Sequence, residues 1–225
     1  MNKTKRTATI VGILFILATV LSLASSSLTD PLTGATNYLA IIAAKQNQII
    51  VGALLLLGAA LSIVLIPAAI FPVLKPKNES IAVGYLGIRI VEAVTLVVDT
   101  IVLLLLVTLS QQYVAAQASA ASYFQTLGAM LLGTHNWIFP LNPIVFGIGG
   151  LMLYYLLFRS KVIPRWLSGW GFIGAVLILM AGLLGMFSSF LVVLAVPIAV
   201  QEMAMAVWLI IKGFNPAAVD QSLTS

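Results

Sequence analysis

Residues 81–109, IAVGYLGIRIVEAVTLVVDTIVLLLLVTL, decide the fold of this chain. A bilayer core about 30 Å thick needs roughly 20 apolar residues in a helix, so this stretch is long enough to cross a membrane. It also carries Arg89, Glu92 and Asp99, each of which is costly inside a bilayer unless it is paired or hydrated. At about 100° per residue these three side chains fall within roughly 80° of one another, and Tyr85 lies close to the same stripe. The stripe predicts that this helix turns one polar face toward the interior of a bundle.

The composition is that of a membrane protein. Of 225 residues, 61 % are hydrophobic and only 8 % are charged, whereas a soluble domain has about 25 % charged residues. This excludes a soluble globule and a disordered chain. The net charge of +5 comes from short basic clusters between apolar runs and not from a basic face with interleaved aromatics, which excludes nucleic-acid binding. The chain has no cysteine, so disulfides, thiol nucleophiles and cysteine-ligated metals are excluded as well.

Six segments are long and apolar enough to span a membrane. They predict an all-α fold, a polytopic membrane protein with a six-transmembrane-helix bundle. The bundle is expected to form one domain over residues 1–212, followed by a cytoplasmic tail at 213–225 that we expect to be disordered. The six predicted spans are residues 8–28, 49–74, 81–109, 137–158, 166–187 and 190–211.

The distribution of Lys and Arg predicts the orientation, because cytoplasmic loops collect these residues. With the N-terminus inside, nine loop and tail cations are cytoplasmic and only Lys45 is external. Both termini are therefore expected in the cytoplasm and the protein in the cytoplasmic membrane. The nine cytoplasmic cations are Lys3, Lys5, Arg6, Lys75, Lys77, Arg159, Lys161, Arg165 and Lys212.

The N-terminus also resembles a signal peptide. A basic start, an apolar stretch and the small residues Ala24, Ser25 and Ser26 are the three parts of such a segment. Cleavage there would leave five helices in the same orientation. Because the apolar stretch is longer than a signal core and the cleavage pattern is loose, we favour a retained first helix.

Two longer external segments separate the spans. Residues 29–48 contain ATNYLAIIAAK (35–45), which predicts a short helix. Residues 110–136 contain no Asp, Glu, Lys or Arg, and their apolar stretch 123–132 is expected in the membrane interface or beside the bundle. Prolines inside spans predict kinks and glycines predict close helix packing. They are Pro67, Pro72, Pro140, Pro143 and Pro197, and Gly147, Gly149, Gly150, Gly171, Gly174, Gly182 and Gly185.

Further polar residues extend the stripe into a candidate polar core. Glu202 lies near the centre of the last span, and Asn142 lies at a depth similar to that of Asp99. His135 lies at the outer mouth of the predicted bundle. The candidate binding residues, expected to form a track from the outside to the middle of the membrane, are Tyr85, Arg89, Glu92, Asp99, His135, Asn142, Gln201 and Glu202.

The charges of this core are unbalanced, with three carboxylates against one arginine. Arg89 can bind one of them, and the candidates are its i+3 neighbour Glu92 and Glu202. At least one carboxylate then lacks a fixed cation, and in a low dielectric it is neutral, hydrated or paired with a mobile cation. Two interpretations stay open, an Arg–carboxylate clamp that fixes the third span against the sixth and a proton-exchanging site. For Asp99, solvation and a functional role are both open.

The sequence predicts no cofactor and no metal site. His135 is the only histidine, whereas an intramembrane metal site generally needs two or three, so interfacial hydrogen bonding is its expected role. The chain contains no Gly-x-Ser-x-Gly motif, phosphate loop, dinucleotide fingerprint or pair of haem-binding histidines. Enzymatic chemistry of these familiar kinds therefore has no sequence support.

Four segments carry a resemblance to a known family. They are MNKTKRTATIVGILFILATVLSL (1–23), GYLGIRIVEA (84–93), FRSKVIPRWLSGWGFIGAV (158–176) and PIAVQEMAMAVWLIIKGFNP (197–216). Together they resemble the bacterial family of multi-pass membrane proteins described as domain of unknown function 4386. The resemblance implies a six-helix integral membrane protein with a retained first helix. This family has no established activity and assigns no role to any residue, and Asp99 is not part of its pattern.

Three functions are consistent with the sequence. The first is a structural or regulatory membrane protein with an intramembrane Arg–carboxylate clamp. The second is a transporter-like protein that handles a small molecule, an ion or protons with the cluster of Arg89, Glu92 and Glu202. The third, with the least sequence support, is an intramembrane enzyme. The expected partners are the lipid bilayer, a small molecule, lipid or proton at the polar core, and a second copy of the chain, but no nucleic acid.

Overall fold

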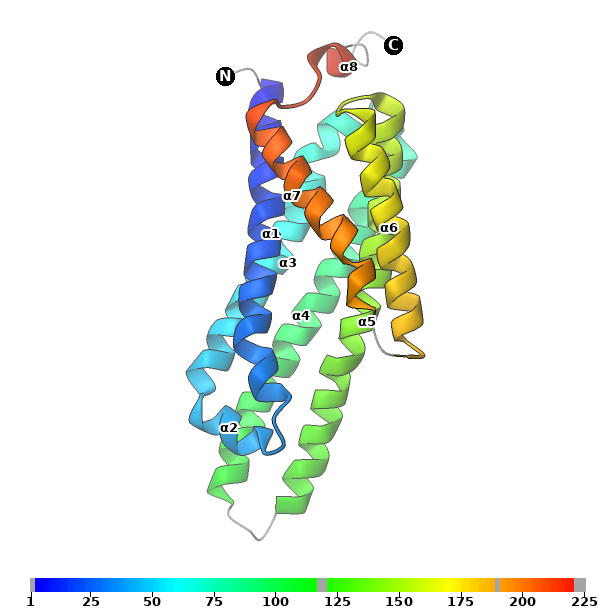
Figure 1. Ribbon diagram of the computed structural model, residues 1–225. Helices are drawn as coiled ribbons and strands as arrows, with labels where there is room; N and C mark the ends of the chain where they lie inside the picture. Colours follow the sequence, from blue (N-terminus) through cyan, green and yellow to red (C-terminus); the bar gives the residue numbers. More distant parts are fainter. Residues whose placement is uncertain (1–2, 117–120, 189–190, 221–225) are drawn as a thin grey trace. The chain divides into compact units, whose positions relative to one another are not determined.

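The computed structural model describes residues 3–116, 121–188 and 191–220. Within these ranges every regular element is a helix, which confirms the all-α prediction. The elements, labelled in Figure 1, are α1 (Lys3–Thr33), α2 (Tyr38–Ala44), α3 (Gln46–Leu74), α4 (Glu79–Ala115), α5 (Ala121–Ser160), α6 (Arg165–Gly185), the 3-10 turn η2 (Val192–Leu194), α7 (Val196–Ile211) and α8 (Pro216–Asp220).

Five helices, α1, α3, α4, α5 and α6, are long and apolar enough to cross a membrane. The predicted sixth span, residues 190–211, is shorter in the structure, because α7 begins at Val196 and has 16 residues. Pro197 lies in the first turn of α7, where a missing backbone N–H costs no helical hydrogen bond. The prediction that Pro197 kinks a helix is therefore wrong. The other four prolines do lie inside helices, in α3 and α5.

The segment 110–136 differs from its prediction. α4 continues to Ala115 and α5 begins at Ala121, so both ends of this segment extend the two long helices. The apolar stretch 123–132 is the first part of α5, and its expected place in the interface or beside the bundle stays a prediction. The connection at residues 117–120 lies outside the described residues. The short helix predicted within 35–45 is confirmed as α2.

The chain is divided into two compact units that share their helices. α1, α3, α4 and α5 each contribute one part to each unit, so the predicted polar stripe on α4 is divided as well. Each unit is therefore described by itself. Unit 1 comprises residues 1–17, 61–93 and 140–225, and unit 2 comprises residues 18–60 and 94–139.

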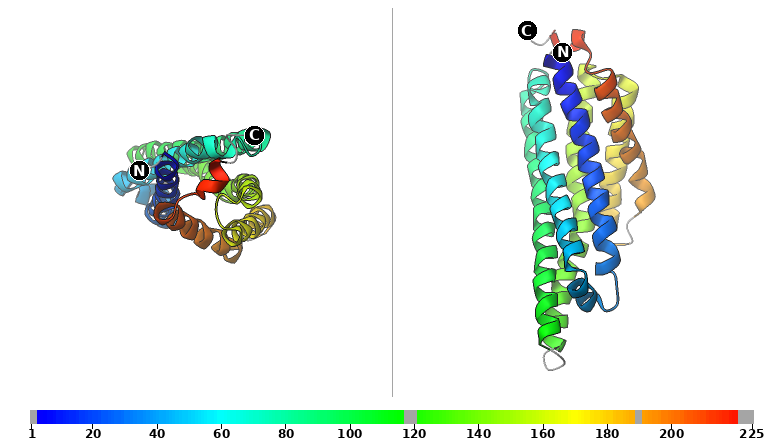
Figure 2. Two further views of the ribbon diagram at one scale, coloured as in Figure 1. Left: turned by 90° about the horizontal axis from the view of Figure 1, so that it is seen from above. Right: turned by 90° about the vertical axis from the view of Figure 1, so that its left-hand side faces the viewer.

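In unit 1, α6 and α7 pack side by side, as Figure 1 and Figure 2 show. Glycines bring the helices of this unit close together. A Cβ at Gly174 would lie 3.0 Å from the backbone of Ile198 on α7, and a Cβ at Gly147 would lie 2.7 Å from Leu179. The packing role predicted for the glycines is confirmed at these two positions.

The start of α1, α8 and the connections after α3 and α5 meet at one end of unit 1 (Figure 1). Lys5 donates from Nζ to the carbonyl oxygen of Ile210, at the end of α7, over 2.9 Å. Lys77, which follows α3, donates to a carbonyl oxygen of α8. The Asn215 N–H donates to the carbonyl oxygen of Val162 over 2.9 Å. Four segments that are far apart in the sequence are thus neighbours.

The tail is more ordered than expected. We expected disorder from residue 213 onward, but the structure has α8 there, and both Phe214 and Ala218 are buried. Gly213 permits the turn after α7, since its φ of 81° lies in the left-handed region. The expectation of a disordered tail is therefore wrong for residues 213–220, and residues 221–225 lie outside the description.

In unit 2, the second half of α1 packs against the first half of α3. Ser25 Oγ donates to the Gly52 carbonyl oxygen over 2.8 Å, and the Gln48 side chain donates to the Leu28 carbonyl oxygen over 2.9 Å. A Cβ at Gly52 would lie 2.5 Å from the Thr29 side chain, so the close approach depends on glycine. These contacts fix the part of α1 that carries polar residues.

Candidate functional site

The predicted polar residues fall into two groups, one in each unit. Asp99 and His135 belong to unit 2. The single track that was expected to join all eight residues stays a prediction. Asn142 is half-buried on α5, and its role also stays a prediction. The six residues of unit 1 are Tyr85, Arg89, Glu92, Asn142, Gln201 and Glu202.

The centre of the unit 1 group is an ion pair between Arg89 and Glu92. Arg89 Nη1 lies 2.9 Å from Glu92 Oε2, and the side chains are only 4 % and 3 % exposed. Their i, i+3 spacing on α4 brings them to one face of the helix. The predicted contact of Arg89 with a carboxylate is confirmed, with Glu92 as the partner. Because both residues belong to α4, this ion pair does not itself join two helices.

Packing holds Arg89 against α5. Its guanidinium carbon lies 5.4 Å from the centre of the Phe146 ring, which is the distance of a cation–π contact. Its aliphatic stem passes Gly149, where a Cβ would lie 3.3 Å from Arg89 Cδ. Sequence reasoning missed Phe146, because no local pattern places an aromatic of α5 over an arginine of α4. Gly149 was singled out in the sequence, but only as a position of close helix packing.

α7 contributes Gln201 and Glu202 to this group. Gln201 is fully buried, and its Nε2 donates to the Leu167 carbonyl oxygen over 3.0 Å, which ties α7 to α6. Glu202 is half-buried and close enough to Arg89 and Glu92 to interact with both electrostatically. Among the ion pairs of the described residues, none includes Glu202.

Tyr154 of α5 completes the group, and sequence reasoning missed it. Its side chain is fully buried and interacts electrostatically with Glu202 and Tyr85. Its ring packs against α6, where a Cβ at Gly171 would come within 2.4 Å of it. A tyrosine inside an apolar span is the only sequence feature that points to it. Tyr155 has the same feature but is exposed, so the sequence alone does not distinguish Tyr154 from Tyr155. We call these residues, without Asn142, the polar core: Tyr85, Arg89, Glu92, Tyr154, Gln201 and Glu202.

Several buried atoms of the polar core have no hydrogen-bond partner among the described residues. The Tyr154 hydroxyl lies beside the Gln201 side chain, but without the geometry of a hydrogen bond. Buried polar groups are nearly always hydrogen-bonded, and an unpaired one costs about 1–3 kcal/mol. These atoms come from α4, α5 and α7, so spare hydrogen-bonding capacity is concentrated in one place. They are Tyr85 Oη, Arg89 Nε, Tyr154 Oη and Gln201 Oε1.

The polar core is chemically suited to a proton. It holds two carboxyl groups and one guanidinium, and the guanidinium is paired with Glu92. The ion pair is almost completely closed off from solvent, so a proton enters it more readily than a solute does. Glu202 gives the core a second carboxyl group, close enough to Arg89 and Glu92 to interact with both electrostatically.

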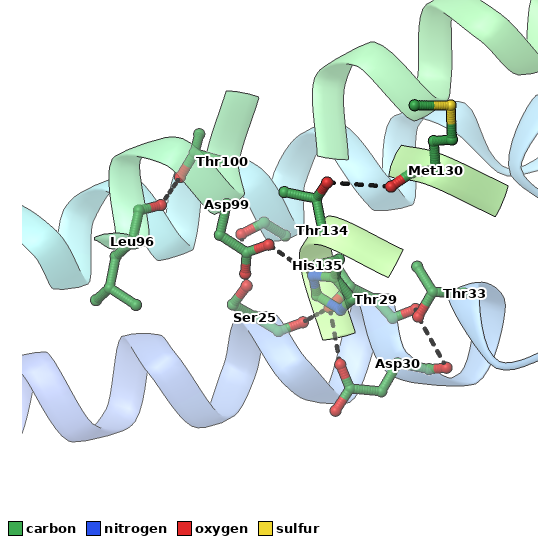
Figure 3. A network of polar contacts seen from close by, with 11 residues as sticks. Ser25, Thr29, Asp30, Thr33, Leu96, Asp99, Thr100, Met130, Thr134 and His135 are labelled. Carbon is green, nitrogen blue, oxygen red and sulfur yellow. Dashed lines mark hydrogen bonds and ion pairs between the residues drawn. The ribbon is translucent and has the colours of Figure 1, made fainter. Parts of the chain in front are cut away.

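In unit 2, Asp99 of α4 and His135 of α5 form a second pair, shown in Figure 3. His135 Nδ1 lies 2.6 Å from Asp99 Oδ1, and the two side chains are 17 % and 11 % exposed, respectively. His135 was expected to make hydrogen bonds at the interface, and the structure identifies Asp99 as a partner. The alternative that Asp99 is simply solvated is wrong, because its carboxylate is nearly buried and bound to the imidazole. This pair joins two helices.

Polar side chains of α1 lie next to this pair, and sequence reasoning missed them (Figure 3). Thr29 Oγ1 lies 3.1 Å from the Ser25 carbonyl oxygen and 3.3 Å from Asp30 Oδ1. Asp30 interacts electrostatically with His135. The available signal was the i, i+4 spacing of Ser25, Thr29 and Thr33, which places three hydroxyl groups on one face of α1.

Comparison with known proteins identifies the family. A family model matches residues 10–213, which is nearly the whole chain. The chain belongs to this family. Its description is Domain of unknown function (DUF4386), and the resemblance drawn from the four sequence segments is thereby confirmed. No curated protein and no solved structure matches the chain.

Both sites of this DUF4386 chain lie inside the matched range. Arg89, Glu92 and Glu202 are within it, and so are Asp99 and His135. The description of DUF4386 names no activity, so a function for these residues has to come from their geometry.

Proposed function

We propose that the chain crosses the cytoplasmic membrane six times, with both termini in the cytoplasm. Five helices have the required length and hydrophobicity. We assign α7 as the sixth span although its 16 residues cover only about 24 Å at 1.5 Å per residue, because it is apolar and η2 before it adds length toward the roughly 30 Å of a bilayer core. The start of α1, α8 and the basic connections after α3 and α5 belong to one end of unit 1, and basic segments are retained in the cytoplasm.

Cysteine labelling tests this topology without background, because the chain contains no cysteine. Thr36→Cys, between α1 and α2, should react with an impermeant thiol reagent added to intact cells. Ser80→Cys, at the start of α4, should react only in inside-out vesicles. Both positions are exposed in the structure, so the difference reports sidedness. Labelling of Ser80→Cys in intact cells would overturn the orientation.

We further propose that the polar core exchanges protons in a transporter-like protein. The observation that carries this proposal is the set of unpaired, buried hydrogen-bonding atoms around Arg89 and Glu92. A purely structural core would pair these groups, because each unpaired one costs free energy. Glu202 adds a carboxyl group that takes part in none of the ion pairs among the described residues. Acids so placed within membrane helices serve as proton carriers in pumps and transporters.

A structural clamp is the second candidate, and one observation favours it. Arg89 is packed between Phe146 and Gly149, and it therefore connects α4 to α5 whether or not protons move. In this function Glu92 serves only to neutralise Arg89. A clamp between α4 and α7 would instead need Glu202 as the ion-pair partner of Arg89.

Thermal stability as a function of pH separates the two functions. Wild type, Glu202→Gln and Glu79→Gln are unfolded by heat from about pH 5 to about pH 8. Glu79 is an exposed glutamate paired with Lys75, so Glu79→Gln controls for the loss of one carboxylate. Proton exchange at Glu202 predicts that the pH profile of Glu202→Gln differs in shape from that of wild type, while Glu79→Gln keeps the wild-type shape. Profiles of the same shape for wild type and Glu202→Gln would contradict proton exchange.

A further inference from the structure

A cleft of about 630 Å³ opens in unit 2 at the Asp99–His135 pair. Its volume lies within the range of small-molecule sites, about 300–1,000 Å³. The end of α1, the turn before α2, the start of α2 and one face of α5 form its walls. The side chains used below are Asp30, Tyr38, Leu132, His135, Asn136 and Phe139, all of which line it.

The cleft carries more acid than base, because the one basic side chain of its lining, His135, is already paired with Asp99. Asp30 is its only lining carboxylate and is exposed to it. Asp99 is not in the lining and acts on the cleft through His135. Unit 2 contains a single lysine, Lys45, and no arginine, and Lys45 does not line the cleft. Two carboxylates, Asp30 and Asp99, thus stand against one imidazole, and this excess of acid makes the cleft attractive to a cation.

The rest of the lining is partly aromatic and apolar. Tyr38 of α2 and Phe139 of α5 line the cleft together with Leu132. Tyr38 is seated against α5, where a Cβ at Gly128 would lie 2.6 Å from its hydroxyl oxygen. Burial raises the pKa of Tyr38 above its ordinary value, so its hydroxyl stays neutral and available as a donor. A carboxylate beside aromatic rings is the combination that recognises an ammonium group.

We propose that this cleft binds a small organic cation that carries an ammonium group on an apolar body. Asp30 is the counter-ion, and Tyr38 and Phe139 contact the apolar body. Asp99 orients His135 by binding Nδ1, which leaves Nε2 for the ligand. A metal ion fits this lining poorly, because it offers one carboxylate and one imidazole, and no three His, Asp or Glu side chains come together in the part of the chain that the structure describes.

Calorimetric titration of the full-length chain in detergent tests the ligand class. The probe is phenethylammonium, and its comparisons are the neutral phenethyl alcohol and the anionic phenylacetate. We expect the ammonium to bind, the alcohol to bind more weakly and the anion not to bind. Equal binding of ammonium and alcohol would reduce the site to an apolar cleft and overturn the proposal. Absence of ammonium binding would overturn it as well.

Substitution of Asp30 tests the counter-ion. Asp30→Asn should weaken phenethylammonium binding at least about tenfold and leave the binding of phenethyl alcohol unchanged. Glu79→Gln removes an exposed carboxylate from unit 1 and should have no effect. Equal losses in Asp30→Asn and Glu79→Gln would show unspecific charge attraction and contradict the proposal. Because Asp30 is exposed, the melting temperature of Asp30→Asn should match that of wild type.

Two further variants complete the test. Tyr38→Ala should weaken the binding of both the ammonium and the alcohol, whereas Tyr38→Phe, which keeps the ring, should retain both. Loss of binding in Tyr38→Phe equal to that in Tyr38→Ala would contradict the role of the ring. Glu202→Gln should leave binding unchanged, so a failure of this proposal is distinguishable from a failure of proton exchange in the polar core.

Discussion

The two pairs of ionisable groups in this chain differ in access. Arg89 and Glu92 belong to one helix of unit 1 and are almost completely buried. In unit 2, Asp99 and His135 belong to two helices, and His135 lines a cleft. The first pair is closed off from solvent, whereas the second lies beside an open cleft. The two pairs therefore differ in how much open space surrounds them.

The two pairs also differ in origin. The pair of Arg89 and Glu92 is set by spacing along α4, so it forms wherever that helix forms. The pair of Asp99 and His135 depends on the packing of α4 against α5 within unit 2. Loss of the first pair therefore leaves an uncompensated charge in a closed interior, whereas loss of the second loosens a contact between helices. The following substitutions test this comparison.

The largest effect is expected from Arg89→Met. It leaves Glu92 without its cation in a closed interior, which should cost about 3–5 kcal/mol of unfolding free energy. Arg165→Met is the matched control, because Arg165 also stacks on a phenylalanine at 5.4 Å but is exposed. Arg165→Met should lower the unfolding free energy by about 1 kcal/mol or less. Unfolding in mixed micelles with increasing dodecyl sulfate measures both, and equal losses would contradict the closed character of the polar core.

The next effect is expected from Gly171→Ala, which tests how tightly the polar core is packed. The new Cβ would come within 2.4 Å of the Tyr154 ring, and overpacking of this kind costs about 1–3 kcal/mol. At Gly87 of α4 a Cβ meets nothing within 4 Å, so Gly87→Ala should be neutral or stabilise by up to about 1 kcal/mol through helix propensity. The same unfolding assay compares them. Equal unfolding free energies for Gly171→Ala and Gly87→Ala would show that the Tyr154 ring does not pack against Gly171.

The smallest effect is expected from Asp99→Asn. The side chains of His135 and Asp99 are 17 % and 11 % exposed, so water compensates part of the loss, which should cost only about 1 kcal/mol of unfolding free energy. The change should be local, with faster amide hydrogen exchange in residues 121–139 of α5 and unchanged exchange in residues 140–160. Asp30→Asn, which leaves the pair intact, is the control. Faster exchange in both parts of α5 would show that the pair also stabilises unit 1.

Features with a local cause could be predicted from the sequence. The long apolar runs predicted the long helices, and the i, i+3 spacing predicted that Arg89 and Glu92 meet. Pro197 also carried a local signal, but it was interpreted as a kink in a longer helix, whereas it marks the first turn of α7.

Features with a tertiary cause could not be predicted. Asp99 and His135 are 36 residues apart, and no periodicity links them. Phe146 contacts Arg89, and Tyr154 belongs to the polar core, only through the packing of α5. The order of the tail depends on contacts such as that of Asn215 with the connection after α5. Six spans, their orientation and a second copy of the chain as partner stay predictions.

The central claim is that Glu202 of the polar core exchanges a proton. Infrared difference spectra of the purified protein between about pH 5 and about pH 8 report the protonation of carboxyl groups directly. We predict a protonated-carboxyl band in wild type that is lost in Glu202→Gln and retained in both Glu79→Gln and Asp99→Asn. A band that is unchanged in Glu202→Gln would contradict proton exchange at this residue.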